Sequence, residues 1–439
     1  MKAKQRINRR KFLTKSAGVT ACSFTAPYFV PASVLGAGDH VAPSNRITMG
    51  CIGNGERGKH VLFEELLKNA KAQVLATCDV ANWRRAEARD AVDEKYGSQD
   101  CTAYHDFREV LARDDLDAVM ISTPDHWHTP IAIAAARAGK DIYLEKPVSH
   151  TVAEGRALAD AVRRYGRVFT TATINRSFPA ARRAVELVRN GRIGKLHTID
   201  VVLPSSKSIE ERNAEIGIPK PDPIPDGFDY DMWLGPAPWV PYNGARVFWM
   251  FRYCADYSGG YMTDWGAHTL DLAQWGNGTQ LSGPTEIEGQ GYRPPTGTYD
   301  VHTRFHVTYT YGNGVKVVVK DGDQHIRFVG TDGWIEFGSA PTDFDASSEE
   351  IKNAEIGPDE IHLYRSEDHT DNFLTCVQNR TETAAPVEVA HRSATMCHLG
   401  IIAMDVGKKL KWDPVAERFT NSEAANRMLS KSMRSPWMI

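Results

Sequence analysis

Gly53-Asn54-Gly55-Glu56-Arg57-Gly58 forms a G-x-G-x-x-G pattern that stands between an apolar run and a helical segment. The apolar run, 47–52, is typical of a buried parallel strand, and residues 59–69 carry apolar side chains at helical spacing. A second apolar strand, 74–77, is followed by Asp79, which lies 26 positions after Gly53. Strand, glycine loop, helix, strand and acid in this order predict a dinucleotide-binding unit, which we favour over a glycine-rich turn without a ligand.

Each glycine of this loop has its own expected task. The first permits the tight turn, the second lets the backbone approach a pyrophosphate, and the third lets the helix pack closely on the strand. The helix N-terminus then presents its N–H groups to the anion. Asp79 would accept hydrogen bonds from a ribose diol and repel a 2′-phosphate, which favours NAD over NADP. Arg84 and Arg85 follow closely and could accommodate a phosphate, so NADP stays an alternative.

The N-terminus carries an export pattern, Asn8-Arg9-Arg10-Lys11-Phe12-Leu13, which has the twin-arginine form. The weakly apolar stretch that follows, 17–34, is too polar and too interrupted by proline to predict a membrane span. We expect residues 1–45 to be a signal and linker that send the folded protein to the periplasm through the twin-arginine translocation machinery, with a disordered basic tail as the alternative. Residues 19–22 resemble a lipoprotein cleavage box, so lipid anchoring at Cys22 is a further alternative.

Composition excludes some classes of function. About 390 residues follow residue 45, enough for two domains with their own cores. The net charge of −3 gives no basic footprint for nucleic acid. Seven cysteines without C-x-x-C spacing indicate buried free thiols, with a disulfide as the alternative in an exported protein. The acidic, proline-rich segment 209–227 is expected to be one long loop.

Strands alternate with helical segments through the first half of the chain. A buried strand over 116–122 precedes the turn Thr123-Pro124-Asp125-His126-Trp127-His128 and a helical segment. Another strand, 142–144, precedes Glu145-Lys146-Pro147 and a second helical segment. This alternation predicts an α/β fold with a doubly wound parallel sheet. Ligands bind beyond the carboxyl ends of such strands, where Thr123, His128 and Lys146 lie.

Beyond residue 198 the pattern changes to longer strands. Residues 303–311 and 315–319 flank Gly312-Asn313-Gly314, a hairpin turn, and a similar pair follows over 326–329 and 334–337. The pattern predicts a C-terminal α+β domain with a large open, mainly antiparallel sheet. Late helical segments are expected over 370–378 and 390–404.

With these motifs the chain resembles the glucose–fructose oxidoreductase/inositol dehydrogenase (Gfo/Idh/MocA) family. The resemblance rests on the glycine loop, the turn from Ser122 to His128, the Glu145-Lys146-Pro147 triplet, and the segment 259–271, which matches the family's D-x-G-x-H signature. Signatures about 120 residues apart and in the expected order are more specific together than either alone. The chain departs from the family pattern at Asp125, where Asn is common, and at Ile174, where Gln is common.

The resemblance spans about residues 46 to 412 and implies a domain organisation. Residues 46–170 would form an NAD(P)-binding Rossmann domain, 171–412 an α+β domain for substrate binding and oligomerisation, and 413–439 a C-terminal tail. A homodimer or homotetramer is expected.

The resemblance also implies a catalytic group of Lys146, Asp264 and His268, with Glu145 and Lys146 contacting the nicotinamide ribose and the reacting hydroxyl. Oxidation of an alcohol needs a base within hydrogen-bond reach of that hydroxyl, and His268 suits this task near neutral pH. Lys146 could lower the pKa of the hydroxyl. Asp264, four positions before His268, could fix the imidazole tautomer or contact the sugar.

The sequence therefore predicts two sets of contacts. The predicted cofactor contacts are Gly53, Asn54, Gly55, Arg57, Gly58, Asp79, Ser122, Thr123, Pro124, His128, Glu145, Lys146, Asn175 and Arg176. The predicted substrate contacts are Lys146, Arg176, Trp233, Tyr253, Asp264 and His268.

Several of these side chains have plainer interpretations. Lys146 could be a surface lysine at a strand end, and Asp264 with His268 could be part of a metal site. Members of the family that the chain resembles work without a metal, so we expect none. Asp271 is more typical of a solvated or capping carboxylate than of a ligand, and His126 suits pocket lining and the surface equally.

The segment 228–265 is rich in aromatic residues, with twelve in 38 positions. Tyr and Trp offer an apolar face to sugar C–H groups and a polar edge to hydroxyls, so together they suit a carbohydrate or cyclitol better than a small acid. Any single one is more typical of the core or of a subunit interface. Arg176 and Arg252 are the best candidates for recognising an anion.

These observations predict an exported NAD(P)-dependent oxidoreductase that acts on a sugar, glycoside or inositol hydroxyl through a tightly bound nicotinamide. One alternative is a glycoside hydrolase that uses NAD for transient oxidation, elimination and re-reduction. Another is a sugar or nucleotide sensor without catalysis, against which the presence of both Lys146 and His268 argues.

Overall fold

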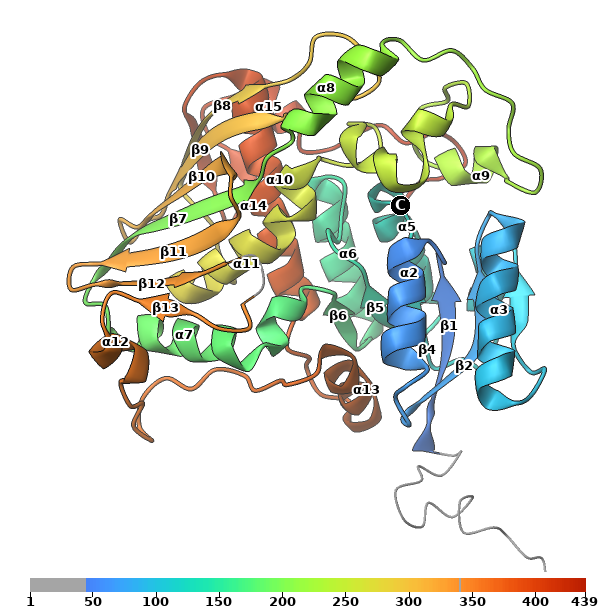
Figure 1. Cartoon of the computed structure of the whole chain (residues 1–439), viewed down its shortest axis with the longest axis horizontal. Helices are drawn as coiled ribbons and strands as arrows, with labels where there is room; N and C mark the ends of the chain where they lie inside the picture. Colours follow the sequence, from blue (N-terminus) through green and yellow to red (C-terminus); the bar gives the residue numbers. More distant parts are fainter. Residues whose placement is uncertain (1–44, 339–340) are drawn as a thin grey trace, which may run out of the picture. The chain divides into compact units, whose positions relative to one another are not determined.

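The computed structural model describes residues 45–338 and 341–439, so the twin-arginine pattern and Cys22 lie outside the described residues. Residues 47–439 form one unit, in which a parallel sheet and a mixed sheet are each flanked by helices (Figure 1). Within the described part of the chain, no helix is long and apolar enough to cross a bilayer.

The first sheet is parallel, in the order β3-β2-β1-β4-β5-β6. Its strands are β1 Ile47–Ile52, β2 Ala72–Cys78, β3 Thr102–Tyr104, β4 Ala118–Ile121, β5 Asp141–Leu144 and β6 Phe169–Thr171. The connecting helices include α3 Asn82–Tyr96, α4 Phe107–Leu111, α5 Asp125–Arg137 and α6 Val152–Tyr165. The strand order reverses between β1 and β4, and a crevice for ligands is expected at that point. The predicted doubly wound sheet is confirmed.

The crossover after β1 begins within the glycine loop. Helix α2 spans Glu56–His60 and continues as the π-helix η4, Val61–Leu66, so it starts earlier than the apolar spacing predicts. Val61, Leu62 and Leu66 are fully buried in the core that this helix shares with the sheet. The N–H groups of the first helical turn therefore belong to the loop that is expected to bind the nucleotide.

The second sheet runs in the order β13-β12-β11-β7-β10-β9-β8-β14-β15. Its strands are β7 Leu196–Pro204, β8 Glu286–Tyr292, β9 Arg304–Thr310, β10 Lys316–Gly322, β11 His325–Gly330, β12 Trp334–Phe337, β13 Asp345–Ala346, β14 Leu410–Asp413 and β15 Arg418–Phe419. β7 pairs in parallel with β10 and antiparallel with β11. The predicted mainly antiparallel sheet is confirmed, and β7 makes it mixed.

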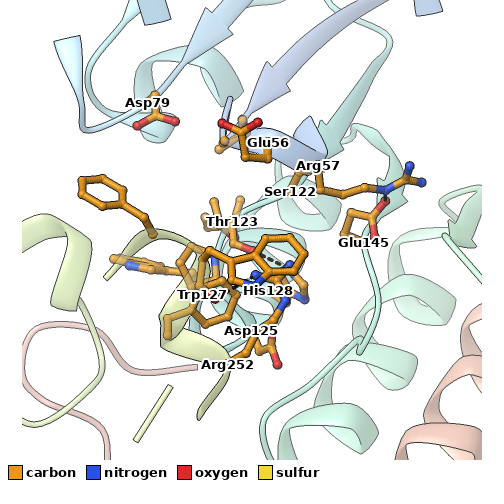
Figure 2. A pocket seen from close by; sticks show the side chains of 18 of the residues that line it. Glu56, Arg57, Asp79, Ser122, Thr123, Asp125, Trp127, His128, Glu145 and Arg252 are labelled. Atoms are coloured by element: carbon orange, nitrogen blue, oxygen red, sulfur yellow. Dashed lines mark hydrogen bonds and ion pairs between the residues drawn. The ribbon is translucent and has the colours of Figure 1, made fainter. Parts of the chain in front are cut away.

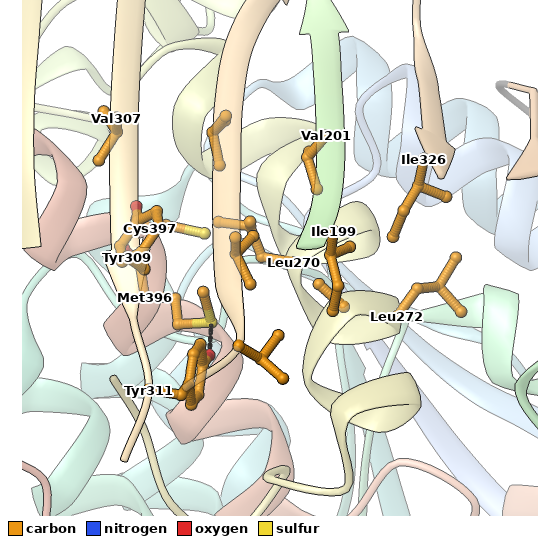
Figure 3. Packing of buried hydrophobic residues seen from close by; sticks show 14 of the residues in the cluster. Ile199, Val201, Leu270, Leu272, Val307, Tyr309, Tyr311, Ile326, Met396 and Cys397 are labelled. Atoms are coloured by element: carbon orange, nitrogen blue, oxygen red, sulfur yellow. Dashed lines mark hydrogen bonds between the residues drawn. The ribbon is translucent and has the colours of Figure 1, made fainter. Parts of the chain in front are cut away.

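One face of this sheet packs on α7 Pro179–Arg189, α11 Gly266–Asn277 and α14 Val387–Val406. Figure 3 shows Ile199 and Val201 of β7 on the side of the sheet that faces Leu270 and Leu272 of α11. Helix α14 also packs against α6, and α13, His369–Asn379, contributes apolar side chains to the core of the parallel sheet. The late helices thus join the two sheets into one unit.

Shorter helices complete the chain. They are η5 Ile174–Ser177, α8 Lys207–Ile216, α9 Tyr230–Leu234, η6 Gly244–Arg246, η7 Phe248–Tyr253, α10 Tyr261–Asp264, α12 Glu349–Asn353 and α15 Glu423–Arg427. The described cysteines are buried free thiols.

The expectation of one long loop over 209–227 is wrong, because α8 occupies its first part. Ile209 is buried, and Oδ1 of Asn213 accepts hydrogen bonds from the backbone N–H groups of Thr298 and Tyr299 at 2.7 and 2.9 Å. Composition marks this segment as polar, but its first half is a helix, which Ile209 and Asn213 anchor to the hydrophobic core and to a distant loop.

Candidate active site

A cavity of about 480 Å³ lies at the carboxyl ends of the central parallel strands. The parallel-sheet half of the chain contributes the glycine loop, Asp79, the turn that begins at Ser122, and Lys146 to its wall. The second half contributes Asp264, His268 and aromatic side chains. Figure 2 shows side chains from both halves pointing into this space.

The glycine loop has the geometry that pyrophosphate binding requires. Gly53 has a φ of +86°, and a Cβ on Gly58 would lie 2.1 Å from the Gly53 carbonyl oxygen, so side chains are excluded at both positions. Gly55 lines the cavity, and a Cβ there would lie 3.2 Å from Nη1 of Arg84. Asn54 is buried, and its side chain donates a hydrogen bond to the backbone of β2. A bare backbone at a helix N-terminus fits a bound dinucleotide.

Asp79 lines the cavity at the end of β2. Its Oδ2 accepts a hydrogen bond from the N–H of Asn54 at 2.8 Å, and its Oδ1 accepts one from Ala81 at 2.9 Å. Burial raises the pKa of this carboxyl, although the backbone donors and Arg84 oppose the rise. Arg84 holds its guanidinium 4.6 Å from the ring centroid of Phe248, on the same stretch of wall. Both a carboxylate and a guanidinium therefore flank the expected ribose position.

Lys146 and Asp264 form an ion pair on the cavity wall. The Lys146 ammonium donates to Oδ1 of Asp264 at 2.5 Å and to its backbone carbonyl at 2.8 Å. Arg252 places Nε 3.7 Å from the other carboxylate oxygen. Burial alone would raise the pKa of Asp264, but the charges of Lys146 and Arg252 hold it below its ordinary value. The carboxylate thus stays ionised and fixes the position of the ammonium.

His268 lies beside this pair in the first turn of α11. Burial, followed by the positive charge of Lys146, lowers its pKa to about 3. The imidazole is therefore neutral at neutral pH, which is the state that a proton acceptor needs. Its Nδ1 is buried without a hydrogen-bond partner among the described residues. The carboxylate of Asp264 accepts its hydrogen bond from Lys146; α10 ends at Asp264, and α11, which carries His268, begins at Gly266.

The side chains of Arg57 and His128 join the loops around the cavity. Nε of Arg57 donates to Oε1 of Glu145 at 2.6 Å, which links α2 to the residue that follows β5. The two ring nitrogens of His128 lie 2.6 Å from the carbonyl oxygen of Pro147 and 2.8 Å from that of Thr123. The strand ends of β4 and β5 are therefore held together by side chains that the sequence marks as cofactor contacts.

Arg176, a predicted contact of both cofactor and substrate, does not reach the cavity wall. It donates to the two carboxylate oxygens of Asp271 at 2.6 and 2.9 Å, and both residues are buried. The expectation that Asp271 is a solvated or capping carboxylate is wrong, because this ion pair ties η5 to α11. Asn175 and Tyr253 are likewise buried and absent from the wall.

The aromatic segment divides into two groups. Trp233, Trp249 and Tyr261 reach the cavity, whereas Tyr242 and Tyr257 are buried away from it, in a hydrophobic cluster to which Trp233 also belongs. This division agrees with the expectation that a single aromatic residue of the segment can belong to the core.

His126 is neither on the cavity wall nor on the surface. It is buried, with Nε2 3.1 Å from the backbone oxygen of Trp233, and burial lowers its pKa to about 4. It belongs to α5 and packs against α9, behind the cavity wall.

Family models match both halves of the chain. The Gfo/Idh/MocA model described as "Oxidoreductase family, NAD-binding Rossmann fold" matches residues 47–173. The model described as "Oxidoreductase family, C-terminal alpha/beta domain" matches residues 211–439. The chain belongs to the Gfo/Idh/MocA oxidoreductase family.

Curated members of this family are distant in sequence. The uncharacterized oxidoreductase YrbE of Bacillus subtilis is 24% identical over 75% of this chain and 84% of its own length. A glycosyl hydrolase family 109 protein of Shewanella is 34% identical, over 35% of this chain and 36% of its own length. Levoglucosan dehydrogenase of Pseudarthrobacter phenanthrenivorans is 33% identical, over 34% of this chain and 39% of its own length.

Solved structures share the fold. Levoglucosan dehydrogenase in complex with NADH and L-sorbose has a TM-score of 0.62 at 19% identity, covering 84% of this chain and 99% of the other. Aldose-aldose oxidoreductase from Caulobacter crescentus has a TM-score of 0.61 at 17% identity, covering 83% and 99%. These solved structures therefore share the fold of this chain, in which a parallel and a mixed sheet form one unit.

Sequence reasoning missed several wall residues. Phe107 and Trp127 line the cavity from α4 and α5, and Asp125 accepts a hydrogen bond from Ser258 at 2.5 Å. The position of Trp127 inside the turn after β4 was a usable signal, since ligands bind beyond strand ends. Ser258 carried no such signal, because its contact joins residues 133 positions apart.

Proposed function

We propose that this family member transfers hydride between a hydroxyl of a sugar, glycoside or inositol and a tightly held nicotinamide nucleotide. The observation that carries the proposal is the Lys146–Asp264 ion pair beside a neutral His268, in the same cavity as the glycine loop. Such a cavity supplies a hydrogen-bond donor and a proton acceptor next to an expected nucleotide.

The nicotinamide, when bound, supplies a hydride acceptor at its C4. His268 takes the hydroxyl proton on an unprotonated ring nitrogen as the carbon loses hydride. Lys146 donates a hydrogen bond to the oxygen that gains negative charge, and Asp264 holds the ammonium in position. Arg57 and Glu145 keep the glycine loop at a fixed distance from this group.

A carbohydrate is the proposed substrate because aromatic faces stand beside the polar group. Trp233, Trp249 and Tyr261 share the cavity wall with Asp264 and His268. Support comes from the relatives, since levoglucosan dehydrogenase is similar in sequence over 34% of this chain and similar in fold over 84% of it.

We propose NAD as the cofactor, since Asp79 places a carboxylate at the end of β2. Arg84 beside it makes NADP the outcome to be tested. Comparison of the dissociation constants for NAD and NADP tests this cofactor preference. Tighter NADP binding by the wild-type protein would contradict the proposal.

Export through the twin-arginine route and function as a homodimer or homotetramer in the periplasm are also proposed. A protein that leaves the cytoplasm folded must load its nucleotide first and release it slowly. Protein recovered from the periplasm should therefore carry nearly one nucleotide per chain through gel filtration, with affinity of nanomolar order. Cytoplasmic location, or empty protein that exchanges micromolar NAD freely, would contradict this.

The main proposal is tested by identifying the bound nucleotide and by finding a sugar that reduces it. The purified protein is denatured, any released nucleotide is identified, and sugars are screened for reduction of the bound cofactor by absorbance at the NADH band. A cofactor that no sugar, glycoside or cyclitol reduces would contradict the proposal.

A glycoside hydrolase that oxidises its substrate transiently is the second candidate. The 34% identity to a glycosyl hydrolase family 109 protein favours it, over 35% of this chain. Release of an aglycone from a chromogenic glycoside without net change in NADH would establish this second candidate in place of net oxidation.

A further inference from the structure

The last residues of the chain return to the nucleotide half of the molecule. The ring of Trp437 lies 4.8 Å from that of Trp127 at 73° and 6.4 Å from that of Phe107 at 42°. The guanidinium of Arg108 lies 5.3 Å from the Trp437 ring centroid. Figure 1 accordingly marks the chain end beside α5, the helix that carries Trp127. Trp437 thus joins the core of the parallel sheet, from a segment predicted to be a tail.

Arg434 fixes the segment that delivers this ring. Its Nη1 donates to Oδ1 of Asp231 at 2.6 Å, and its Nε donates to the carbonyl oxygen of Gly235 at 2.8 Å. Its backbone N–H donates to the carbonyl oxygen of Pro236 at 2.8 Å. These partners belong to α9 and the turn after it, so the segment is held at both backbone and side chain.

The same helix holds Trp127 from the other side. Nε1 of Trp127 donates to the carbonyl oxygens of Met232 and Trp233 at 3.1 and 3.0 Å. Contacts therefore run in a closed circuit from Trp127 to α9, from α9 to Arg434, and from Trp437 back to Trp127. Trp127 belongs to this circuit, and Phe107 is its neighbour. Both line the cavity, as do Met232 and Trp233 of α9. Trp437 stands behind that wall.

The topology indicates which part of the cavity this wall serves. Phe107 begins α4, just after β3, and β3 lies next to β2 on the side of the sheet that presents Asp79. An adenosine ribose is expected at Asp79, whereas Lys146 and His268 lie beyond β5 and in α11. The wall of Phe107 and Trp127 therefore faces the adenosine half of the nucleotide.

We propose that residues 434–437, here called the C-terminal clamp, are positioning residues for the dinucleotide. They hold Trp127 and Phe107 as a preformed apolar wall, and so they set nucleotide affinity without contacting the reacting atoms. The proposal rests on the proposed NAD-dependent function.

The test measures equilibrium dissociation constants of the full chain, freed of nucleotide, for NAD and for ADP-ribose by calorimetry. Trp437→Ala should weaken both by on the order of tenfold, because two ring pairs are lost. Trp437→Phe should keep most of the wild-type affinity for both ligands. Arg434→Gln should weaken the binding of both, as Trp437→Ala does. Met438→Ala is the matched control, since Met438 is 77% exposed and adjoins Trp437. Turnover at saturating NAD should change less than twofold in all four variants.

The outcomes separate the two proposals. A wild-type protein that binds neither ligand overturns the proposed function and the clamp with it. A wild-type protein that binds NAD, beside folded Trp437→Ala and Arg434→Gln variants of unchanged affinity, overturns the clamp alone. If Trp437→Ala does not fold, Trp437→Phe and Arg434→Gln carry the test, and unchanged affinity in both overturns the clamp. An equal loss of affinity in Met438→Ala would also overturn it.

Discussion

Lys146, Asp264 and His268 come from three different parts of the chain, yet the charge of Lys146 acts on both of the others. The ammonium of Lys146 keeps Asp264 ionised. Burial lowers the pKa of His268 most, and the charge of Lys146 lowers it further, so His268 stays neutral. Removal of one member therefore changes the others, and single substitutions measure the group rather than one residue.

Lys146→Ala or His268→Ala should lower turnover by on the order of 10²-fold or more, with nucleotide binding largely kept, because each removes a group from the proton transfer. Steady-state rates on a sugar that reduces the bound cofactor provide the measurement. Lys320→Ala, at an exposed strand position, is the control and should be neutral. Near-normal turnover in either variant would remove that residue from the mechanism.

The pH dependence of the reaction follows from the lowered pKa of His268, about 3. A base must be unprotonated to act, so an ordinary histidine loses activity as the pH falls through about 6.5. His268 instead stays unprotonated well below that value. Initial rates of alcohol oxidation should give a kcat/KM without an acid limb at pH 6.5, and a half-loss near that pH would show that His268 is an ordinary histidine or is not the base.

Gly55→Val should abolish nucleotide binding while the protein stays folded. The new side chain would lie on the cavity wall, where its Cβ would meet only the flexible end of Arg84. Calorimetric titration with NAD and a circular dichroism spectrum give the two readouts. Undiminished affinity in the folded variant would contradict pyrophosphate binding at this loop.

At the scale of elements, the contact between α11 and the mixed sheet positions His268. Helix α11 lies on the sheet through Leu270 and Leu272, two to four positions after His268 (Figure 3). The same helix takes part in the buried Arg176–Asp271 pair, which anchors it to η5. The site therefore depends on a helix whose placement is set by packing on one side and by an ion pair on the other.

Gly276→Ala tests that packing. A Cβ at Gly276 would lie 2.2 Å from the ring of Phe328 on β11, a contact that α11 must relieve by shifting. The free energy of unfolding should fall by about 1–3 kcal/mol. Urea unfolding provides the measurement, and Gly338→Ala, where no atom lies within 4 Å of the added Cβ, is the control. Equal stability of the two variants would show that α11 is free to move at this point.

At the scale of the whole molecule, buried neutral histidines link stability to pH. Burial lowers the pKa of His126 and of His398 to about 4. Each has a pKa of about 6.5 when unfolded, so the unfolded chain binds more protons below that pH. The stability that each contributes is fully present above pH 6.5 and is lost as the pH falls toward about 4. Glu154, whose pKa burial raises to about 7, acts in the opposite direction.

His398→Gln isolates the contribution of one of these histidines to the pH dependence of stability. At pH 5 the wild-type protein should have lost about 2 kcal/mol of unfolding free energy through His398 that the variant does not lose. Urea unfolding of both proteins at pH 7.5 and pH 5 measures the difference in their pH dependence. Parallel pH dependences would contradict a neutral, buried His398.

The local features of this chain were predictable from short-range patterns in its sequence. The glycine loop, the strand and helix alternation and the D-x-G-x-H segment each depend on residues a few positions apart, so periodicity and motif spacing predict them. The parallel sheet, the mainly antiparallel second sheet and the family were predicted from these alone and are confirmed. The roles of Lys146, Asp264 and His268 stay predictions.

Other contacts between distant residues became visible only in the folded chain. Arg176 pairs with Asp271 instead of lining the cavity, and Trp437 packs on Trp127. Asn213 of α8 accepts hydrogen bonds from a loop 85 and 86 positions further along the chain. Such contacts join segments whose sequence patterns predict their own secondary structure but not their tertiary partners. Their partners follow from how the elements pack in three dimensions, which no short-range spacing encodes.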